Sequence, residues 1–315
     1  MNGTRAPWGV LGLEAAPPAT FGVGQRSLNL AKPTAGNSFE NLPLDPDQVL
    51  VCRAMSFSAE IKGWVRRHIS DSQSRALKHH YGKVVHGGDL RRLARLFGTD
   101  KDGVHFYCQH YQHHFQALRH ERVNLLEIGI GGYDDPNQGG ASLRMWKTYF
   151  PNGRIAGIDL LDKSSLEEER IRTFAGSQVD EVFLKGVIAE FGTPDIIIDD
   201  GSHRPEHVIA SFKILFPLLA PRGIYVVEDL QTSYWGSDSP ITGDWGGASN
   251  LNAPDTSMNF LKSLVDCLNY EEFTLQGYKP SDFDRQIVAM HFYHNLAFIQ
   301  KGRNDEGSNI LGKRF

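Results

Sequence analysis

Residues 123–132 read VNLLEIGIGG, an apolar run that ends in a group of glycines. Three further runs of this kind follow along the chain: GRIAGIDL at 153–160, PDIIIDD at 194–200 and GIYVVED at 223–229. Their hydrophobicity is continuous rather than alternating, which is typical of strands covered on both faces, as in a parallel sheet. Helical periodicity between the runs completes a strand, helix, strand order, which predicts an α/β fold with a doubly wound sheet.

The expected helices and the end of the sheet can be placed along the chain. Three stretches between or after the apolar runs have helical periodicity: 142–150, 165–171 and 206–219. Residues 285–291 and 295–301 predict two more strands with a tight connection, an antiparallel hairpin at one edge of the sheet. We therefore expect the sheet domain to span 121–303, followed by a tail at 304–315.

The chain before the first run is expected to have two parts. Residues 1–44 are rich in proline and glycine and have no helical or strand period, which predicts an arm without a core of its own. Residues 45–120 carry apolar side chains at spacings of two to four, which predicts a helical N-terminal segment. This segment is rich in histidine, from His68 to His120. Solvated helix faces explain these histidines better than a zinc site, because none has Cys or carboxylate partners at a metal-binding spacing.

The composition of the 315 residues argues against several classes of protein. Lys and Arg total 33 against 37 Asp and Glu, and a net charge of -4 offers no basic field for nucleic acid. The three cysteines are odd in number and far apart, which argues against a disulfide framework. A reducing compartment, the cytoplasm, fits them best. No apolar run approaches the roughly 18 residues that span a bilayer, and the N-terminus lacks the apolar stretch of a signal peptide. We expect a homo-oligomer in the cytoplasm, with no nucleic-acid partner.

The first apolar run ends in an E-x-G-x-G pattern formed by Glu127, Gly129 and Gly131. Ligands of open parallel sheets bind at the carboxyl ends of the strands, where glycines let the backbone approach them closely. A pyrophosphate fingerprint would need a third glycine where this chain has Asp134, which disfavours a nicotinamide dehydrogenase. The pattern instead suits S-adenosylmethionine, a cationic ligand that Glu127 would attract. A tight strand-to-helix turn without a ligand is an equal alternative at this point.

The second strand and the segment after the next helix could complete a nucleoside site. Asp159 ends the second run, and its carboxylate could accept both hydroxyls of a ribose, although Asp162 competes for this role. Ser177 and Gln178 lie where an adenine edge could be recognised. The structural alternative for Asp159 is a helix cap or a solvated strand end.

Carboxylates also follow the next two runs, at Asp199, Asp200, Glu228 and Asp229. Like charges in one cleft raise each other's pKa, so a counter-charge is expected, and Mg²⁺ prefers carboxylate oxygens. We expect Asp200, Glu228 and Asp229 to be its ligands. His203 lies three residues past Asp200, close enough to take a proton from a hydroxyl bound there. Polar strand ends followed by a helix cap are the simpler alternative.

Four segments together resemble a known family: LLEIGIGGYDDPNQGGASLRMW at 125–146, GRIAGIDLLDKS at 153–164, DIIIDDGSHRPEH at 195–207 and GIYVVEDLQTSYW at 223–235. In order and spacing they resemble the metal- and S-adenosylmethionine-dependent sugar O-methyltransferases of macrolide antibiotic pathways, over about residues 95–303. The resemblance implies a class I methyltransferase fold with S-adenosylmethionine over the glycine turn. It also implies Mg²⁺ on Asp200, Glu228 and Asp229, with His203 as the base.

The segment before the first strand resembles the same family at Thr99, Lys101 and Tyr107, which by the resemblance help to enclose the cofactor and the sugar. Without the resemblance, Thr99 is a candidate helix cap and Tyr107 a packing residue. Residues 233–258 are too long and glycine-rich for a simple connection, which predicts a lid. Its two tryptophans could either stack on a sugar ring or anchor the loop.

These observations predict Mg²⁺-dependent transfer of a methyl group from S-adenosylmethionine to a sugar hydroxyl. The expected acceptor is a glycosylated natural product or a glycolipid. One alternative is a catechol-like or other small diol, because the same cation can chelate any two neighbouring oxygens. The other is a non-catalytic partner subunit that binds the cofactor, which intact Asp200, His203 and Glu228 disfavour.

Overall fold

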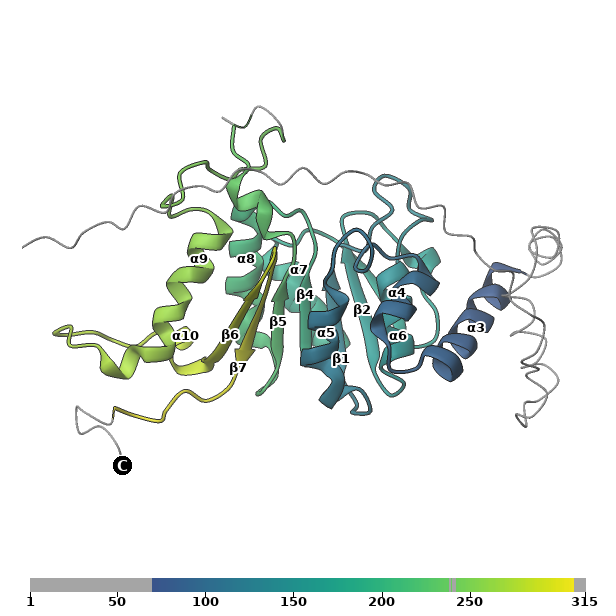
Figure 1. Ribbon diagram of the computed structural model, residues 1–315, viewed down its shortest axis with the longest axis horizontal. Coiled ribbons are helices and arrows are strands. Elements are labelled where there is room, and N and C mark those ends of the chain that lie inside the picture. The colour runs from purple at the N-terminus through teal and green to yellow at the C-terminus, as the bar shows by residue number, and fades with distance from the viewer. Residues whose placement is uncertain (1–69, 238, 240–241, 309–315) are drawn as a thin grey trace, which may run out of the picture. The chain divides into compact units, whose positions relative to one another are not determined.

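The computed structural model describes residues 70–308 except 238, 240 and 241. They form a seven-stranded sheet in the order β3-β2-β1-β4-β5-β7-β6, with helices on both faces (Figure 1). The strands are β1 Asn124–Ile128, β2 Arg154–Asp159, β3 Ile171–Ala175, β4 Ile196–Asp199, β5 Ile224–Val227, β6 Ile287–Tyr293 and β7 Leu296–Lys301. The predicted arm and residues 45–69 of the predicted helical segment lie outside the described residues.

Helices precede the sheet and connect its strands. They are α3 Asp71–Tyr81, α4 Leu90–Phe97, α5 Cys108–Phe115, α6 Ala141–Tyr149, α7 Glu181–Phe191, α8 Pro205–Leu215, α9 Ser257–Leu264 and α10 Asp282–Gln286. Helix α4 has clear ends, because the Asp89 side chain accepts a hydrogen bond from the Arg92 amide and Gly98 closes the helix at a φ of 77°. Among the described residues, no helix is long and apolar enough to cross a membrane.

The sheet is parallel from β3 to β5 and antiparallel at its other edge. Strand β1 pairs in parallel with both β2 and β4, and β5 pairs in parallel with β4. Strands β7 and β6 then add antiparallel pairs, so the predicted doubly wound sheet with an edge hairpin is confirmed. The order of the strands reverses between β1 and β4, which is where open α/β sheets bind ligands.

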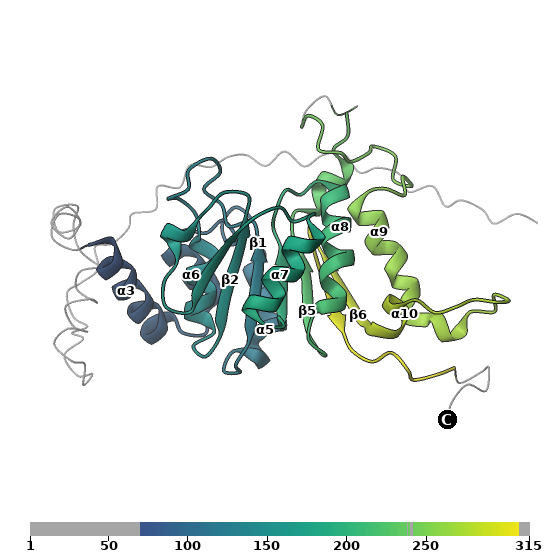
Figure 2. The same ribbon diagram turned by 180° about the vertical axis from the view of Figure 1, so that it is seen from behind.

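Both faces of the sheet are buried, which explains the continuous hydrophobicity of the parallel strands. On one face, Leu125 packs in a cluster with Trp146, beneath α4, α5 and α6. On the other face, seen in Figure 2, Leu126 packs in a cluster with Phe212, beneath α7, α8 and α9. Successive residues of one strand thus enter different cores, so both sides of these strands are mainly apolar.

The predicted helix at 165–171 is wrong. The structure has a short 3-10 turn at Ser164–Leu166, and β3 begins at Ile171. Arg170, at a φ of 66°, donates hydrogen bonds to the carbonyls of Phe150 and Gly153, which fix the chain in a non-helical path. Strand β3 lies at the edge of the sheet and is only partly buried, so it lacks the continuous apolar run that marks the central strands.

Candidate functional site

Three of the predicted residues converge at the carboxyl edge of the sheet. Asp200 and His203 follow β4, Asp229 follows β5, and ligand atoms of these three side chains all lie within 4.8 Å of one another. Among residues 70–308, apart from the three omitted positions, no second group of three metal-ligand side chains converges in this way. The two carboxylates supply the oxygen ligands that Mg²⁺ prefers, so the residues present fit this ion.

Unusual backbone conformations aim two of these side chains. His203 and Asp229 have φ angles of 56° and 53°, in the left-handed region that side chains other than glycine rarely adopt. The Thr232 hydroxyl donates to the carbonyl of His203 at 2.6 Å and to the carbonyl of Asp229 at 3.1 Å, so one side chain fixes both residues. The imidazole Nε2 of His203 then lies 3.7 Å from Asp229 Oδ2. Such strain is typical of functional sites, where the surrounding structure holds it in place.

Lys101 forms the centre of a cluster of three carboxylates, of which those of Glu127 and Glu228 are buried and that of Asp200 is partly exposed. Its Nζ lies 2.6 Å from Glu228 Oε1, 2.7 Å from Asp200 Oδ2 and 3.2 Å from Glu127 Oε1. The lysine side chain is 1% exposed, and it reaches the sheet from the loop between α4 and α5. The sequence predicted Lys101 as a residue that encloses the cofactor. The structure places its ammonium group against three acids in or just after the adjacent strands β1, β4 and β5, and its contact with a cofactor stays a prediction.

The pKa values of this cluster follow from burial and from mutual charge. Burial lowers the pKa of Lys101, but the charges of its three carboxylate partners outweigh burial and raise it well above its usual value. Burial raises the pKa of Glu127 to about 7, although Lys101 acts in the opposite direction. Burial also raises the pKa of Asp200 and, together with the charge of Asp200, that of Glu228. The ammonium group of Lys101 opposes the rise in the pKa of all three acids and so favours their ionised forms.

The two neighbouring acids after β5 have different surroundings. Glu228 is 3% exposed and accepts hydrogen bonds from Lys101 and from the Tyr111 hydroxyl. Asp229 accepts a hydrogen bond of 2.7 Å from the Tyr107 hydroxyl and belongs to the converging group. Glu228 lies outside that group, and its role as a metal ligand stays a prediction. Tyr107, predicted to enclose the cofactor, contacts Asp229 in the structure, and its contact with a cofactor stays a prediction.

Asp199 and Gln178 form a buried link between β4 and the loop after β3. Gln178 Nε2 donates to Asp199 Oδ1 at 3.2 Å, and Gln178 Oε1 accepts from the Ser202 amide at 2.8 Å. Asp199 also accepts hydrogen bonds from Ser211 and Tyr225. The amide of Gln178 thus has protein partners on both atoms, so its predicted contact with adenine stays a prediction.

The glycine turn after β1 has one closed and one open position. Both glycines have left-handed φ angles, 78° at Gly129 and 70° at Gly131. A Cβ atom on Gly129 would overlap the backbone carbonyl of Asp200, whereas a Cβ on Gly131 would meet nothing within 4 Å. Gly129 therefore allows the turn to pack on the loop after β4, and Gly131 leaves open space for a ligand.

The remaining predicted cofactor residues lie around this turn with local partners. Asp159 ends β2, and its Oδ1 accepts from the Leu161 amide at 3.0 Å. The Ser177 hydroxyl accepts from the Val179 amide at 3.3 Å. Thr99 lies just after α4, two residues before Lys101, and is buried. Their contacts with a cofactor stay predictions.

Lys163 is a residue that sequence reasoning missed. Its ammonium group donates to the carbonyls of Asp135, Gln138 and Gly131 at 2.7, 3.0 and 3.1 Å, and its side chain is 1% exposed. These carbonyls belong to the loop that follows the glycine turn, so Lys163 fixes the path of that loop. The only signal in the sequence was its place in one of the four family-like segments.

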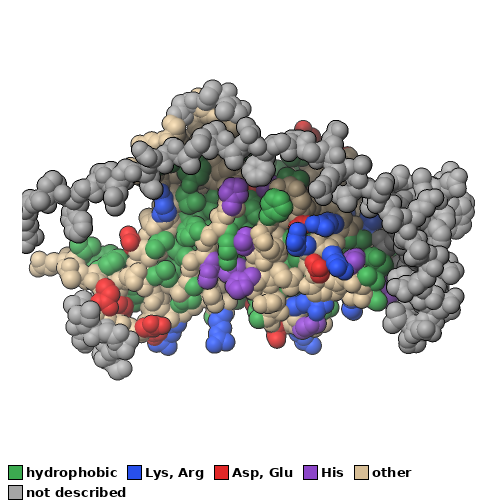
Figure 3. Space-filling view, viewed as in Figure 1, with side chains coloured by type: hydrophobic (Ala, Val, Ile, Leu, Met, Phe, Trp, Pro, Cys, Tyr) green, Lys and Arg blue, Asp and Glu red, His purple; other side chains and the backbone are tan. Residues whose placement is uncertain are grey.

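Histidine side chains gather on the face of the molecule shown in Figure 3. His114 of α5 stacks on Phe298 with ring centroids 4.1 Å apart, lies 4.7 Å from His291 of β6, and bonds the Tyr293 hydroxyl at 3.0 Å. Burial and the neighbouring histidines lower the pKa of His114 to about 4. Aromatic packing accounts for these contacts, and the group is absent from the converging metal-ligand sets of the described residues.

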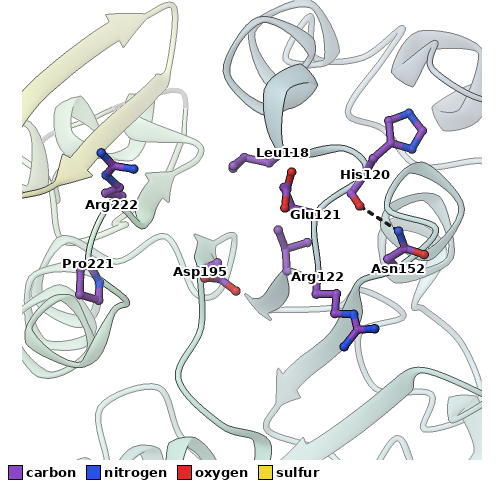
Figure 4. A pocket seen from close by; sticks show the side chains of 9 residues that line it. Leu118, His120, Glu121, Arg122, Asn152, Asp195, Pro221 and Arg222 are labelled. Atoms are coloured by element: carbon purple, nitrogen blue, oxygen red, sulfur yellow. Dashed lines mark hydrogen bonds between the residues drawn. The ribbon is translucent and has the colours of Figure 1, made fainter.

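A hollow of about 560 Å³ lies at the opposite, amino edge of the sheet (Figure 4). Its lining includes Leu118, His120, Arg122, Asn152, Asp195 and Arg222. Asn152 Nδ2 donates to the His120 carbonyl at 2.8 Å, a bond that Figure 4 marks. Because open parallel sheets bind ligands at the other edge, this hollow is separate from the candidate site.

The chain has close relatives among proteins of known activity, although no family model matches it. It is 46% identical over 221 residues to mycinamicin VI 2''-O-methyltransferase of Micromonospora griseorubida, an alignment that covers 70% of this chain and 54% of that protein. It is 48% identical over 222 residues to demethylmacrocin O-methyltransferase of Streptomyces fradiae, covering 70% and 54%. The resemblance to the sugar O-methyltransferases is confirmed. The chain spans about half the length of these curated relatives.

Solved structures of the MycE methyltransferase from the mycinamycin biosynthetic pathway match the same fold. The complex with Mg and SAH has a TM-score of 0.67 at 44% identity and covers 72% of this chain and 58% of that one. The complex that also holds mycinamycin VI has a TM-score of 0.68 at 39% identity, covering 82% and 66%. The predicted class I methyltransferase fold is therefore confirmed.

Proposed function

We propose that this protein transfers the methyl group of S-adenosylmethionine to a sugar hydroxyl of a glycosylated natural product, in a Mg²⁺-dependent reaction. The observation that carries the proposal is the convergence of Asp200, His203 and Asp229 beside the E-x-G-x-G turn. Relatives of this chain are named as O-methyltransferases, one of them as 8-demethyl-8-alpha-L-rhamnosyl tetracenomycin-C 2'-O-methyltransferase of Streptomyces olivaceus, which supports a sugar as the acceptor. A glycolipid is the second acceptor class that the same site would serve.

Asp200 and Asp229 would hold the cation, with Glu228 as a third carboxylate if it turns away from Lys101. When bound, Mg²⁺ makes a coordinated hydroxyl more acidic and orients two neighbouring oxygens of the sugar. The side chain of Asp200 is 24% exposed, so the pair of carboxylates of Asp200 and Asp229 is open on one side to solvent and to an acceptor. Tyr107 supports this arrangement, because its hydroxyl holds Asp229 from the other side.

His203 would act as the general base. Its proton acceptor is Nε2, which faces the carboxylate of Asp229 at 3.7 Å and lies next to the proposed ion ligands. The imidazole would take the proton of the sugar hydroxyl, and S-adenosylmethionine, when bound, would supply the methyl group to that oxygen and leave as S-adenosylhomocysteine. Thr232 contributes by holding the backbone of His203 in its left-handed conformation.

The cofactor would lie over Gly131, in the space that a side chain at this position would fill. Asp159 is the proposed acceptor for its ribose hydroxyls, because it ends the strand beside β1. Ser177, Gln178 and Thr99 would line the rest of the nucleoside site. Lys163 would act indirectly, through the loop that it holds.

The covering role of the predicted lid at 233–258 stays a proposal, and its two tryptophans have partners within the segment itself. Trp245 packs against Trp235 with ring centroids 6.3 Å apart, and its amide donates to the Trp235 carbonyl at 3.0 Å. Trp245 Nε1 donates to the Thr242 carbonyl. These contacts favour the tryptophans as anchors of the loop over free stacking surfaces for a sugar. The cytoplasmic location and the homo-oligomeric state stay predictions of the sequence.

The test is a methyl-transfer assay with isotope-labelled S-adenosylmethionine, Mg²⁺ and a panel of acceptors. The panel contains macrolide glycosides, a rhamnosyl glycolipid and a catechol, and products are read by mass spectrometry. We expect one labelled methyl group on the sugar of a glycoside and none after EDTA treatment. Methylation of the catechol alone would replace the acceptor class, and full activity in EDTA would remove the metal from the mechanism.

A further inference from the structure

The loop that carries Lys101 is fixed at both ends. Asp102, the next residue, accepts hydrogen bonds from Arg91 and Arg95 of α4 at 2.9 and 2.8 Å. The carbonyl of Lys101 accepts from the amides of Tyr107 and Cys108 at 3.2 Å each, which ties the loop to the start of α5. The ammonium group is thus delivered to the sheet edge by a rigid loop rather than by a free surface side chain.

Lys101 and the proposed metal ion draw on the same carboxylates. Lys101 contacts Asp200 and Glu228, two of the three acids predicted to be metal ligands. Asp200 belongs both to this cluster and to the converging group with His203 and Asp229. A divalent ion at Asp200 would therefore lie close to a buried positive charge, and burial keeps water from screening the repulsion.

We propose that Lys101 is a built-in cation that competes with the divalent metal ion for Asp200 and Glu228. This inference rests on the proposed function, since it takes the metal to bind at this edge. The ammonium group of Lys101 binds the carboxylate of Glu228 and neutralises part of the negative charge of Asp200. The open site therefore presents fewer free carboxylate oxygens to the metal. The metal is then held weakly enough to leave room for a sugar oxygen to bind it.

Two other roles for Lys101 make different predictions. A purely structural lysine would, when replaced, lower stability without raising the affinity for Mg²⁺. A lysine that mainly contacts the cofactor would, when replaced, weaken binding of S-adenosylhomocysteine and leave Mg²⁺ affinity unchanged. Of the three roles, only competition with the metal predicts that removal of the ammonium group tightens Mg²⁺ binding.

The experiment is a calorimetric titration of the full chain with MgCl₂ after removal of metals by chelator. Lys101→Met removes the charge, and Lys101→Gln removes it while keeping a hydrogen-bond donor. We expect both variants to bind Mg²⁺ at least about tenfold more tightly than the wild type, because the loss of a nearby like charge favours the cation. Lys185→Met is the matched control, since Lys185 is exposed and pairs with Glu181.

Thermal unfolding with and without MgCl₂ extends the test to a variant that folds poorly without metal. We expect Mg²⁺ to raise the Tm of both Lys101 variants more than that of the wild type. Mg²⁺ that binds the wild type but binds the variants equally or more weakly would overturn the competition and leave the proposed function intact. A wild-type chain that binds no Mg²⁺ would overturn both.

Discussion

Gly129 and Gly131 allow the packing of the glycine turn to be separated from its exposure to a ligand. Both have left-handed φ angles, so alanine at either position costs about 1–2 kcal/mol through the backbone. At Gly129 the new Cβ also overlaps the Asp200 carbonyl, and overpacking of this kind costs about 1–3 kcal/mol more. We therefore expect Gly129→Ala to lose about 2–5 kcal/mol and Gly131→Ala about 1–2 kcal/mol.

These free energies of unfolding convert to measurable shifts in Tm. For a domain of this size, each kcal/mol lowers Tm by about 2–4 °C, so Gly129→Ala should melt well below Gly131→Ala in calorimetry. Per unit of folded protein, Gly131→Ala should bind S-adenosylhomocysteine more weakly than Gly129→Ala does. Gly131→Ala places a methyl group in the open space before the turn and should weaken binding, although the fold is retained.

Equal melting temperatures for the two alanine variants would refute the reasoning about packing. They would mean that the loop after β4 moves away from the turn at little cost, and that the contact with Asp200 does not constrain Gly129. Unchanged binding of S-adenosylhomocysteine to Gly131→Ala would refute the proposed position of the cofactor.

Three further substitutions test single roles. His203→Ala should lower kcat by about two to four decades, while the affinity for S-adenosylhomocysteine stays near that of the wild type. The control is His80→Ala, since His80 is exposed on α3. Near-native turnover in the His203 variant would mean that another residue is the base. Thr232→Val removes the hydroxyl that holds His203 and should lower kcat with little change in KM, whereas a change in KM alone would argue against a positioning role. Lys163→Met should weaken S-adenosylhomocysteine binding about tenfold or more, since a lost charge-assisted hydrogen bond to a loop carbonyl costs about 1.5–3 kcal/mol; calorimetric affinity equal to that of Lys185→Met would contradict this.

The central strands and their carboxyl ends could be predicted from the sequence because burial on both faces leaves a distinct pattern. Strands β4 and β5 consist mainly of apolar residues and lead directly into acids, whereas β1 leads into the glycine turn. Once these strands are neighbours, the acids after them must share one edge. Strand β3 escaped this reasoning because it lies at the edge of the sheet and is only partly buried, so it has no continuous apolar run.

The organisation of charge within the site could not be predicted in the same way. Lys101 meets Asp200 and Glu228 across 99 and 127 residues of sequence, through a loop whose path depends on the packing of α4 and α5. Lys163 likewise acts on carbonyl groups, which have no sequence signature. Because Mg²⁺ and a buried lysine both neutralise carboxylates, the acids alone do not distinguish the two.

Crystals of the full chain with S-adenosylhomocysteine and Mn²⁺ in place of Mg²⁺ would test the central claim most directly, because anomalous scattering locates the ion. We expect one strong peak at the carboxyl edge of the sheet, bound by the carboxylates of Asp200 and Asp229 at about 2.1 Å, with the cofactor over Gly131. Its distance to Glu228 would show whether this acid turns from Lys101 to the metal. A fully occupied cofactor site with no peak beside Asp200 and Asp229, or a peak only elsewhere on the molecule, would contradict the proposed metal-dependent methyl transfer.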